Sequence, residues 1–588
     1  MIDRVRRSKG SVTKTAVAAS KPAPSRQTAF ERQLSDAFAA MSSGEWEVAR
    51  SRFTALAEAD PSPAGEVLEG LAVSLFRVGS VSQACAAMER AHAAFIDEAS
   101  PHRAIRAAAF MVSARSVLGE QAASRGWEQR GLRLVEQTGP CIEQGYLALA
   151  TVGCEIHDAR ELTRRAELAH MLALKFGDHE LELRALGDLG LALVSRGQVD
   201  KGFGLLDEAM VGAAAGEMPT VSTRCMTYCA MFSACERTGD IGRAEYWCRH
   251  FEENMGTEAI GLVHCDVLHG VVESLRGRWD NAEARLTSAR DAPAASAHYR
   301  SDSAGRLAEL RIQQGRYREA EELLAGFEDR IEAMPALARL RLVQGDHQQA
   351  AALLRSVARG FGEDYMRLAP VLAVSIEVEL QRGDAAAARR TADRLFKLED
   401  LCESNEIRAL ARLGRARVAL YDGDHGAAIE ELETALTLLI HLERPMLTSQ
   451  VRLELARALA RAGDNAGALA EAENALAGFH RLGIAPEIGA SQSLIGLLTV
   501  DAAGDATGRH ADLASRAESP IGIESLTKRE SEIAALVADG LSNREIADRV
   551  FLSVRTVECH VDRVLGKLAF HTRTQLAGWV HRKGAAKT

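Results

Sequence analysis

Apolar residues recur with a helical period along most of the chain. From about residue 29 to about residue 500 they fall at positions i, i+3, i+4 and i+7, and alanine and leucine dominate over β-branched residues. The alternation typical of a half-buried strand does not occur in this stretch. The pattern therefore predicts an all-α protein built from many amphipathic helices.

A glycine followed five residues later by an alanine punctuates the helical stretch. Glycine adopts the left-handed conformation that ends a helix, and the small alanine lets the next helix pack closely against the first. From Gly239 onward the units are 38, 38, 30, 38, 40 and 40 residues apart. The pattern predicts stacked αα-hairpins, an α-solenoid with a concave groove. The units occur at 44–49, 79–84, 239–244, 277–282, 315–320, 345–350, 383–388, 423–428 and 463–468, with a variant ending in glycine at 197–202.

These units resemble tetratricopeptide repeats, in which a Gly-x-Tyr-x-x-Ala turn separates the two helices. Gly315-Arg-Tyr-Arg-Glu-Ala320 reproduces that turn. Most periods here are longer than the 34 residues of that family. The resemblance covers roughly 470 residues and implies a solenoid whose groove holds an effector, a peptide or a protein partner.

The C-terminal segment carries its own helix signals. Three capping boxes, in which a hydroxyl residue is followed three positions later by Glu or Gln, predict helices over 528–539, 543–550 and 573–583. Ser553 caps another over 554–567, and Gly540 ends the first. The short join at 551–553 predicts a helix-turn-helix over 543–562. The boxes are Thr527–Glu530, Ser542–Glu545 and Thr572–Gln575.

This segment resembles the LuxR-type DNA-binding domain. The resemblance rests on Leu526-Thr-Lys-Arg-Glu-Ser-Glu532, Gly540-Leu-Ser-Asn-Arg-Glu-Ile-Ala547, Leu552-Ser-Val-Arg-Thr-Val-Glu-Cys-His-Val561, Lys567-Leu568 and Arg573-Thr-Gln-Leu-Ala577. It implies a four-helix domain of a bacterial transcription regulator that binds double-stranded DNA, with a fourth helix that pairs two domains into a homodimer on DNA. RNA polymerase is a further candidate partner.

The resemblance also implies roles for single residues. Related domains often carry basic residues at the base-reading positions, whereas Glu558 and Asp562 are acidic here. Either they accept hydrogen bonds from cytosine N4, or they stay solvated and repel wrong registers. The implied base-facing residues are Arg555, Glu558, Cys559 and Asp562; the phosphate contacts are Asn543, Arg544, Ser553, Thr556, Arg563, Lys567 and Arg573; the dimer contacts are Leu576, Trp579 and Val580.

Charge is unevenly distributed over the 588 residues. The net charge is −10, from 71 basic and 81 acidic residues. Residues 524–588 carry 11 basic and 8 acidic groups, a balance of +3, which leaves −13 on the rest. Residues 1–28 are predicted to form a disordered basic arm, and residues 501–523 a linker. With no long apolar segment or signal peptide, we expect a cytoplasmic protein.

Signatures of catalysis are missing from the sequence. There is no Gly-x-x-x-x-Gly-Lys-[Ser/Thr] loop, so the ATPase of many large LuxR-type regulators is not expected. We expect no enzyme activity, no cofactor and no metal. We interpret a group of cysteines as small apolar residues that fill the core: Cys225, Cys229, Cys235, Cys248 and Cys265. The alternative is that they form a zinc or redox site with nearby histidines.

Together these features favour a sequence-specific DNA-binding regulator controlled through its repeats. The acidic body is expected to disfavour DNA binding by the tail, electrostatically or sterically. The alternative is an interaction scaffold whose helical tail does not bind DNA.

Overall fold

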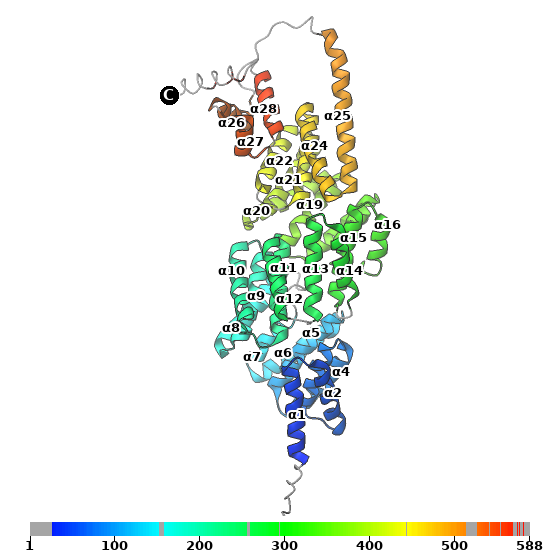
Figure 1. The fold of residues 1–588 in the computed structure, drawn as a ribbon, viewed down its shortest axis with the longest axis vertical. Coiled ribbons are helices and arrows are strands. Elements are labelled where there is room, and N and C mark those ends of the chain that lie inside the picture. Colours follow the sequence, from blue (N-terminus) through cyan, green and yellow to red (C-terminus); the bar gives the residue numbers. More distant parts are fainter. Residues whose placement is uncertain are drawn as a thin grey trace, which may run out of the picture. The chain divides into compact units, whose positions relative to one another are not determined.

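The described part of the chain is entirely helical. The computed structural model describes residues 26–512 apart from 152–157, 256–258, 293–294, 441 and 443, and residues 526–567 apart from 540 and 553, together with 573, 576 and 580. These residues form 28 helices and no strand, as the apolar periodicity predicts (Figure 1). No helix among them combines the length and the apolar character needed to cross a membrane.

Met1–Ala107 form the first of two compact units. Its first three helices pack around Phe53, which is fully buried against Ala37, Ala49 and Val67. They are α1 (Arg26–Ser42), α2 (Trp46–Ala59), α3 (Gly65–Arg77), α4 (Val81–Asp97) and the beginning of α5 (Pro101–Val117).

Ala108–Thr588 form the second compact unit. Each helix packs mainly on its neighbours in sequence, which is the contact pattern of a solenoid of αα-hairpins. After α5, its helices up to residue 512 are α6 (Gln121–Thr138), α7 (Ile142–Ala148), α8 (Ala159–Phe176), α9 (His179–Ser195), α10 (Val199–Ala215), α11 (Val221–Thr238), α12 (Ile241–Met255), α13 (Ala259–Leu275), α14 (Trp279–Asp291), α15 (Ala297–Gln313), α16 (Tyr317–Leu324), α17 (Met334–Val343), α18 (His347–Gly360), α19 (Tyr365–Gln381), α20 (Ala385–Leu401), α21 (Asn405–Asp422), α22 (His425–Leu439), α23 (Pro445–Arg461), α24 (Asn465–Leu482) and α25 (Ala485–Asp512).

The glycine–alanine units form the hairpin turns, as predicted. Every glycine of the pattern has a φ between +65° and +86°, and each alanine five residues later is 2% exposed or less. One further turn escaped the pattern: Gly119 has a φ of +77°, but its partner position holds the buried Ser124 instead of alanine. In the described chain, these short sequence signals therefore determine where the first helix of a hairpin ends and the second begins.

The second unit also contains contacts between distant repeats. Helix α19 packs on α9 and α11, and the buried Arg237 Nε donates to Asp364 Oδ2 at 3.2 Å, across 127 residues of sequence. The backbone amide of Glu403 donates to the carbonyl of Gly197 at 3.0 Å. The solenoid thus turns far enough for early and late hairpins to touch.

The two predicted boundary segments differ in part from the structure. Helix α25 continues to Asp512, so the first part of the segment predicted as a linker, 501–523, is helical. Helix α1 begins at Arg26, so the last three residues of the predicted basic arm are helical. Residues 1–25 and 513–525 lie outside the described part.

Candidate nucleic-acid interface

Three helices of the C-terminal segment begin close to the predicted positions. They are α26 (Lys528–Ala538), α27 (Asn543–Val550) and α28 (Val554–Lys567). Thr527 and Ser542 both form complete capping boxes: each hydroxyl accepts from the amide of the glutamate three residues on, and that glutamate accepts from the cap amide in return. The third predicted box and Gly540 lie outside the described residues.

A single apolar core holds these helices together. Val557, Val561 and Val564 of α28 face Ile533 of α26 and Ile546 of α27, and all five side chains are buried. These three valines form the inward-facing side of α28. The remaining faces of α28 are therefore the ones that can meet another molecule.

The turn between α27 and α28 is short, and its first residue is strained. Phe551 has a φ of +58°, a left-handed conformation that is uncommon for a residue with a side chain, and its ring is 42% exposed. The guanidinium of Arg529 on α26 donates to the Val550 carbonyl, which would otherwise be an unpaired group at the end of α27. No pattern in the sequence predicts this role of Arg529.

The predicted base-facing residues all lie on α28. Helical spacing puts 555, 558, 559 and 562 on the side away from Val557 and Val561. Glu558 is half-buried, and the side chains of Arg555, Cys559 and Asp562 lie outside the described set.

The predicted phosphate-contacting residues divide into four groups. Arg544 is exposed on the first turn of α27, whose N-terminus carries a partial positive charge. Arg573 donates to Asn543 Oδ1 at 2.5 Å and to the Leu541 carbonyl, so it also braces the start of α27. Thr556 is buried. The side chains of Ser553, Arg563 and Lys567 lie outside the described set.

Two of the three predicted dimer contacts are described. Leu576 is fully buried in the core of its own domain, and Val580 packs partly against that core. Leu576 therefore has no surface to offer a second copy in this conformation. Trp579 lies outside the described residues.

One flank of α28 is docked on the solenoid. Thr556 and His560, one helical turn apart, are each 3% exposed. The Thr556 hydroxyl donates to Glu471 Oε1 of α24, and His560 Nε2 lies 3.1 Å from Glu433 Oε1 of α22. A hydroxyl predicted to contact a phosphate is thus paired with a carboxylate of the same chain.

The sequence analysis identified neither of these glutamates. His560 is buried against the repeats. Glu433 and Glu471 lie 127 and 85 residues before their partners, so no local spacing could relate them. The available signal was weak: each is a buried acidic residue on an otherwise apolar helix face.

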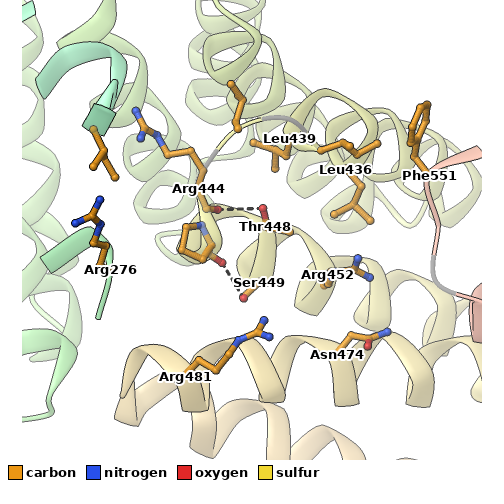
Figure 2. Close-up of a pocket in the computed structure, with 14 residues that line it drawn as sticks. Arg276, Leu436, Leu439, Arg444, Thr448, Ser449, Arg452, Asn474, Arg481 and Phe551 are labelled. Carbon is orange, nitrogen blue, oxygen red and sulfur yellow. Dashed lines mark hydrogen bonds between the residues drawn. The ribbon is translucent and has the colours of Figure 1, made fainter. Parts of the chain in front are cut away.

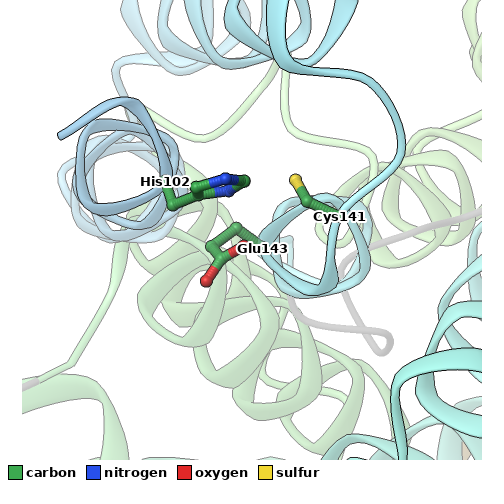
Figure 3. A group of neighbouring side chains, drawn as sticks. All are labelled: His102, Cys141 and Glu143. Atoms are coloured by element: carbon green, nitrogen blue, oxygen red, sulfur yellow. The ribbon is translucent and has the colours of Figure 1, made fainter. Parts of the chain in front are cut away.

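Within the described part of the chain, Cys225, Cys229, Cys235 and Cys248 belong to no cluster of side chains that could hold a metal ion. All four are buried and form no disulfide, and burial raises the pKa of Cys235 well above its ordinary value. Cys265 has no described side chain. Cys141 directly precedes α7, and its side chain lies near that of Glu143 (Figure 3). It is also buried, and burial raises the pKa of its thiol.

Comparison with known proteins identifies the C-terminal domain. Residues 524–580 match the family described as "Bacterial regulatory proteins, luxR family". The transcriptional regulatory protein LiaR of Bacillus subtilis is 48% identical over 59 residues, which is 10% of this chain and 28% of that protein. The DNA-binding transcriptional activator DevR/DosR of Mycobacterium tuberculosis is 42% identical over 67 residues, 11% of this chain and 31% of that protein.

The C-terminal segment is therefore a LuxR-type helix-turn-helix domain, whereas the chain spans less than a third of the length of these curated relatives. The chain is also similar to two solved structures, each at 13% identity. They are the APC/C Cut9–Hcn1 hetero-tetramer, at a TM-score of 0.44 over 81% of this chain and 90% of that one, and yeast Tom70, at 0.30 over 75% and 96%.

Proposed function

We propose that this chain is a sequence-specific DNA-binding transcription regulator whose repeat region holds the recognition helix in a state that cannot bind DNA. In the active state α28 enters the major groove, two copies bind as a dimer, and an effector or partner on the repeats controls the change. The chain then acts in the bacterial cytoplasm, where the chromosome is, and has no catalytic role.

The docking of Thr556 and His560 on α24 and α22 carries this proposal. The major groove is about 12 Å wide and admits one α-helix, so both flanks of a bound helix face the phosphate walls. A flank that contacts two solenoid helices has no room for a phosphate strand. Release of α28 must therefore precede DNA binding.

The distribution of charge supports the same proposal. Outside the C-terminal segment the chain carries a net charge of −13. The carboxylates of Glu433 and Glu471, which contact α28, occupy the side of that helix where we expect a phosphate to lie. Acidic groups repel DNA and also satisfy the donors that would hold it. The solenoid thus competes for the side chains that the duplex needs.

The test removes the docking carboxylates without altering α28. Each charge-assisted hydrogen bond contributes about 1.5–3 kcal/mol, so their loss should favour the released state by tenfold or more. We expect the full chain carrying Glu433→Ala and Glu471→Ala to bind a random-sequence duplex pool at least about tenfold more tightly than the unaltered chain, measured by fluorescence anisotropy at fixed salt.

The matched control carries Glu430→Ala and Glu473→Ala on the same two helices. Both control side chains are exposed, and the net charge changes equally. If both variants gained the same affinity for duplex, the gain would come from the change in net charge and not from the loss of the docking contacts. If neither variant bound duplex even in dilute salt, the proposal would be contradicted. The result would favour the alternative, an interaction scaffold whose helical tail does not bind DNA.

A further inference from the structure

We propose that a cavity beside the docked helix binds a small amphipathic anion, a carboxylate or phosphate group on an apolar body, and that this ligand releases α28. The release step rests on the function proposed above; the binding step does not. The cavity encloses about 560 Å³, within the range of small-molecule sites (Figure 2). It lies wholly in the second compact unit.

The polar lining of the cavity is cationic. Four arginines border it and no carboxylate does. The two hydroxyls in the lining, on Thr448 and Ser449, donate to the carbonyls of Arg444 and Pro445 within their own helix (Figure 2). Guanidinium groups therefore supply the charge-bearing donors, and they match carboxylate or phosphate in geometry. The arginines are Arg276, Arg444, Arg452 and Arg481.

These arginines differ in how far they are already engaged. Arg444 pairs with Glu406 at 2.8 Å, and Arg276 pairs with Glu245. Arg481, exposed on the last turn of α24, has no ion pair with any residue that the structure describes. An anion at this end of the cavity can therefore pair with Arg481 without breaking an ion pair between described residues.

The other side of the lining is apolar. Leu436, Leu439 and Leu442 line it together with Ile440, and Phe551 reaches it from the turn that precedes α28. Ile440 is 38% exposed and Phe551 42%, so both present large apolar surface to solvent. An apolar ligand body would cover this surface, which inorganic phosphate cannot do. The recognition domain itself thus supplies one wall.

Arg452 connects the cavity to the docked flank. Its Nη1 donates to Glu471 Oε2 at 2.6 Å, and Glu471 Oε1 accepts from the Thr556 hydroxyl. Glu471 is fully buried, whereas the Arg452 side chain is 24% exposed. An anion that draws Arg452 into the cavity leaves the Glu471 carboxylate buried without its cation, which destabilises the contact that holds α28.

Calorimetric titration of the full chain tests the binding step. Decanoate serves as the probe, decanamide as its uncharged match, and inorganic phosphate as an anion without an apolar body. We expect saturable binding of decanoate alone, weakened tenfold or more by Arg481→Gln. Arg318→Gln, which changes a 92% exposed arginine on α16, should leave binding unchanged. Equal binding of decanamide, equal binding of phosphate, or no binding of decanoate would overturn the site.

Duplex anisotropy tests the release step. Saturating decanoate should raise the affinity of the unaltered chain for duplex threefold or more, with no gain in the Arg481→Gln chain or in the chain already released by Glu433→Ala and Glu471→Ala. Decanoate that binds without changing duplex affinity would overturn release. If the chain carrying Glu433→Ala and Glu471→Ala failed to bind duplex, the proposed function would be overturned. The calorimetry would still show whether the cavity binds the anion.

Discussion

At the scale of single residues, Cys402 shows how burial removes the chemistry of a thiol. It lies against the turn at Gly197, where a Cβ on the glycine would stand 2.5 Å from the Cys402 sulfur. Burial raises the pKa of Cys402 to about 12. At pH 8 about one thiol in ten thousand is then ionised, against about a quarter for a thiol with an ordinary pKa near 8.5.

We therefore expect Cys402 to resist iodoacetamide in the native chain at pH 8 and to react fully in urea. Peptide-level mass spectrometry measures both states. The thiolate is the nucleophile, so the native rate should be lower by a factor of about a thousand. Native labelling at the rate seen in urea would show that the contact between Cys402 and the Gly197 turn does not persist in solution.

At the scale of elements, Asp364 joins the distant helices α11 and α19. Burial opposes its ionisation, but the positive charges of Arg237 and Arg367 outweigh burial and lower the pKa of Asp364. Removing one partner of a buried ion pair costs about 3–5 kcal/mol. We expect Asp364→Asn, which keeps the helix-capping oxygen, to lower the urea midpoint of the full chain, while Asp393→Asn, at an exposed site, should not.

The Asp364 carboxylate also makes the stability of the fold depend on pH in a defined direction. A pKa that is lower in the folded state than its unfolded value, about 3.9, stabilises the fold above about pH 4 and loses that effect as the pH falls. The difference in free energy of unfolding between the unaltered chain and Asp364→Asn should therefore shrink below pH 4. A constant difference down to pH 2 would mean that Asp364 is not held ionised by the arginines.

At the scale of the whole molecule, local and distant structure differ in how far the sequence predicts them. The hairpin turns and the starts of α26 and α27 follow from glycines, alanines and capping boxes, because each signal lies within six residues. The docking of Thr556 on Glu471 depends instead on how some ten hairpins add their rotations. No short pattern encodes that sum. The sequence therefore shows the negative charge of the repeat region but not the contacts that its residues make with α28.

The number of chains on one duplex can be measured through a single arginine. Arg544 is exposed at the start of α27, and each phosphate contact contributes about 0.9 to the slope of log affinity against log salt concentration. In the released chain, Arg544→Gln removes one contact from a monomer but two from a dimer. We expect the slope to become less steep by about 1.8.

A change near 0.9 would instead mean that one domain binds alone, and no change would remove Arg544 from the interface. Arg318→Gln in the same background, on an exposed solenoid helix, should leave the slope as it was. Because the slope counts charges rather than overall affinity, a variant that only destabilises the domain cannot imitate this result. The measurement therefore separates dimeric recognition by α27 and α28 from weak attraction between a basic tail and any polyanion.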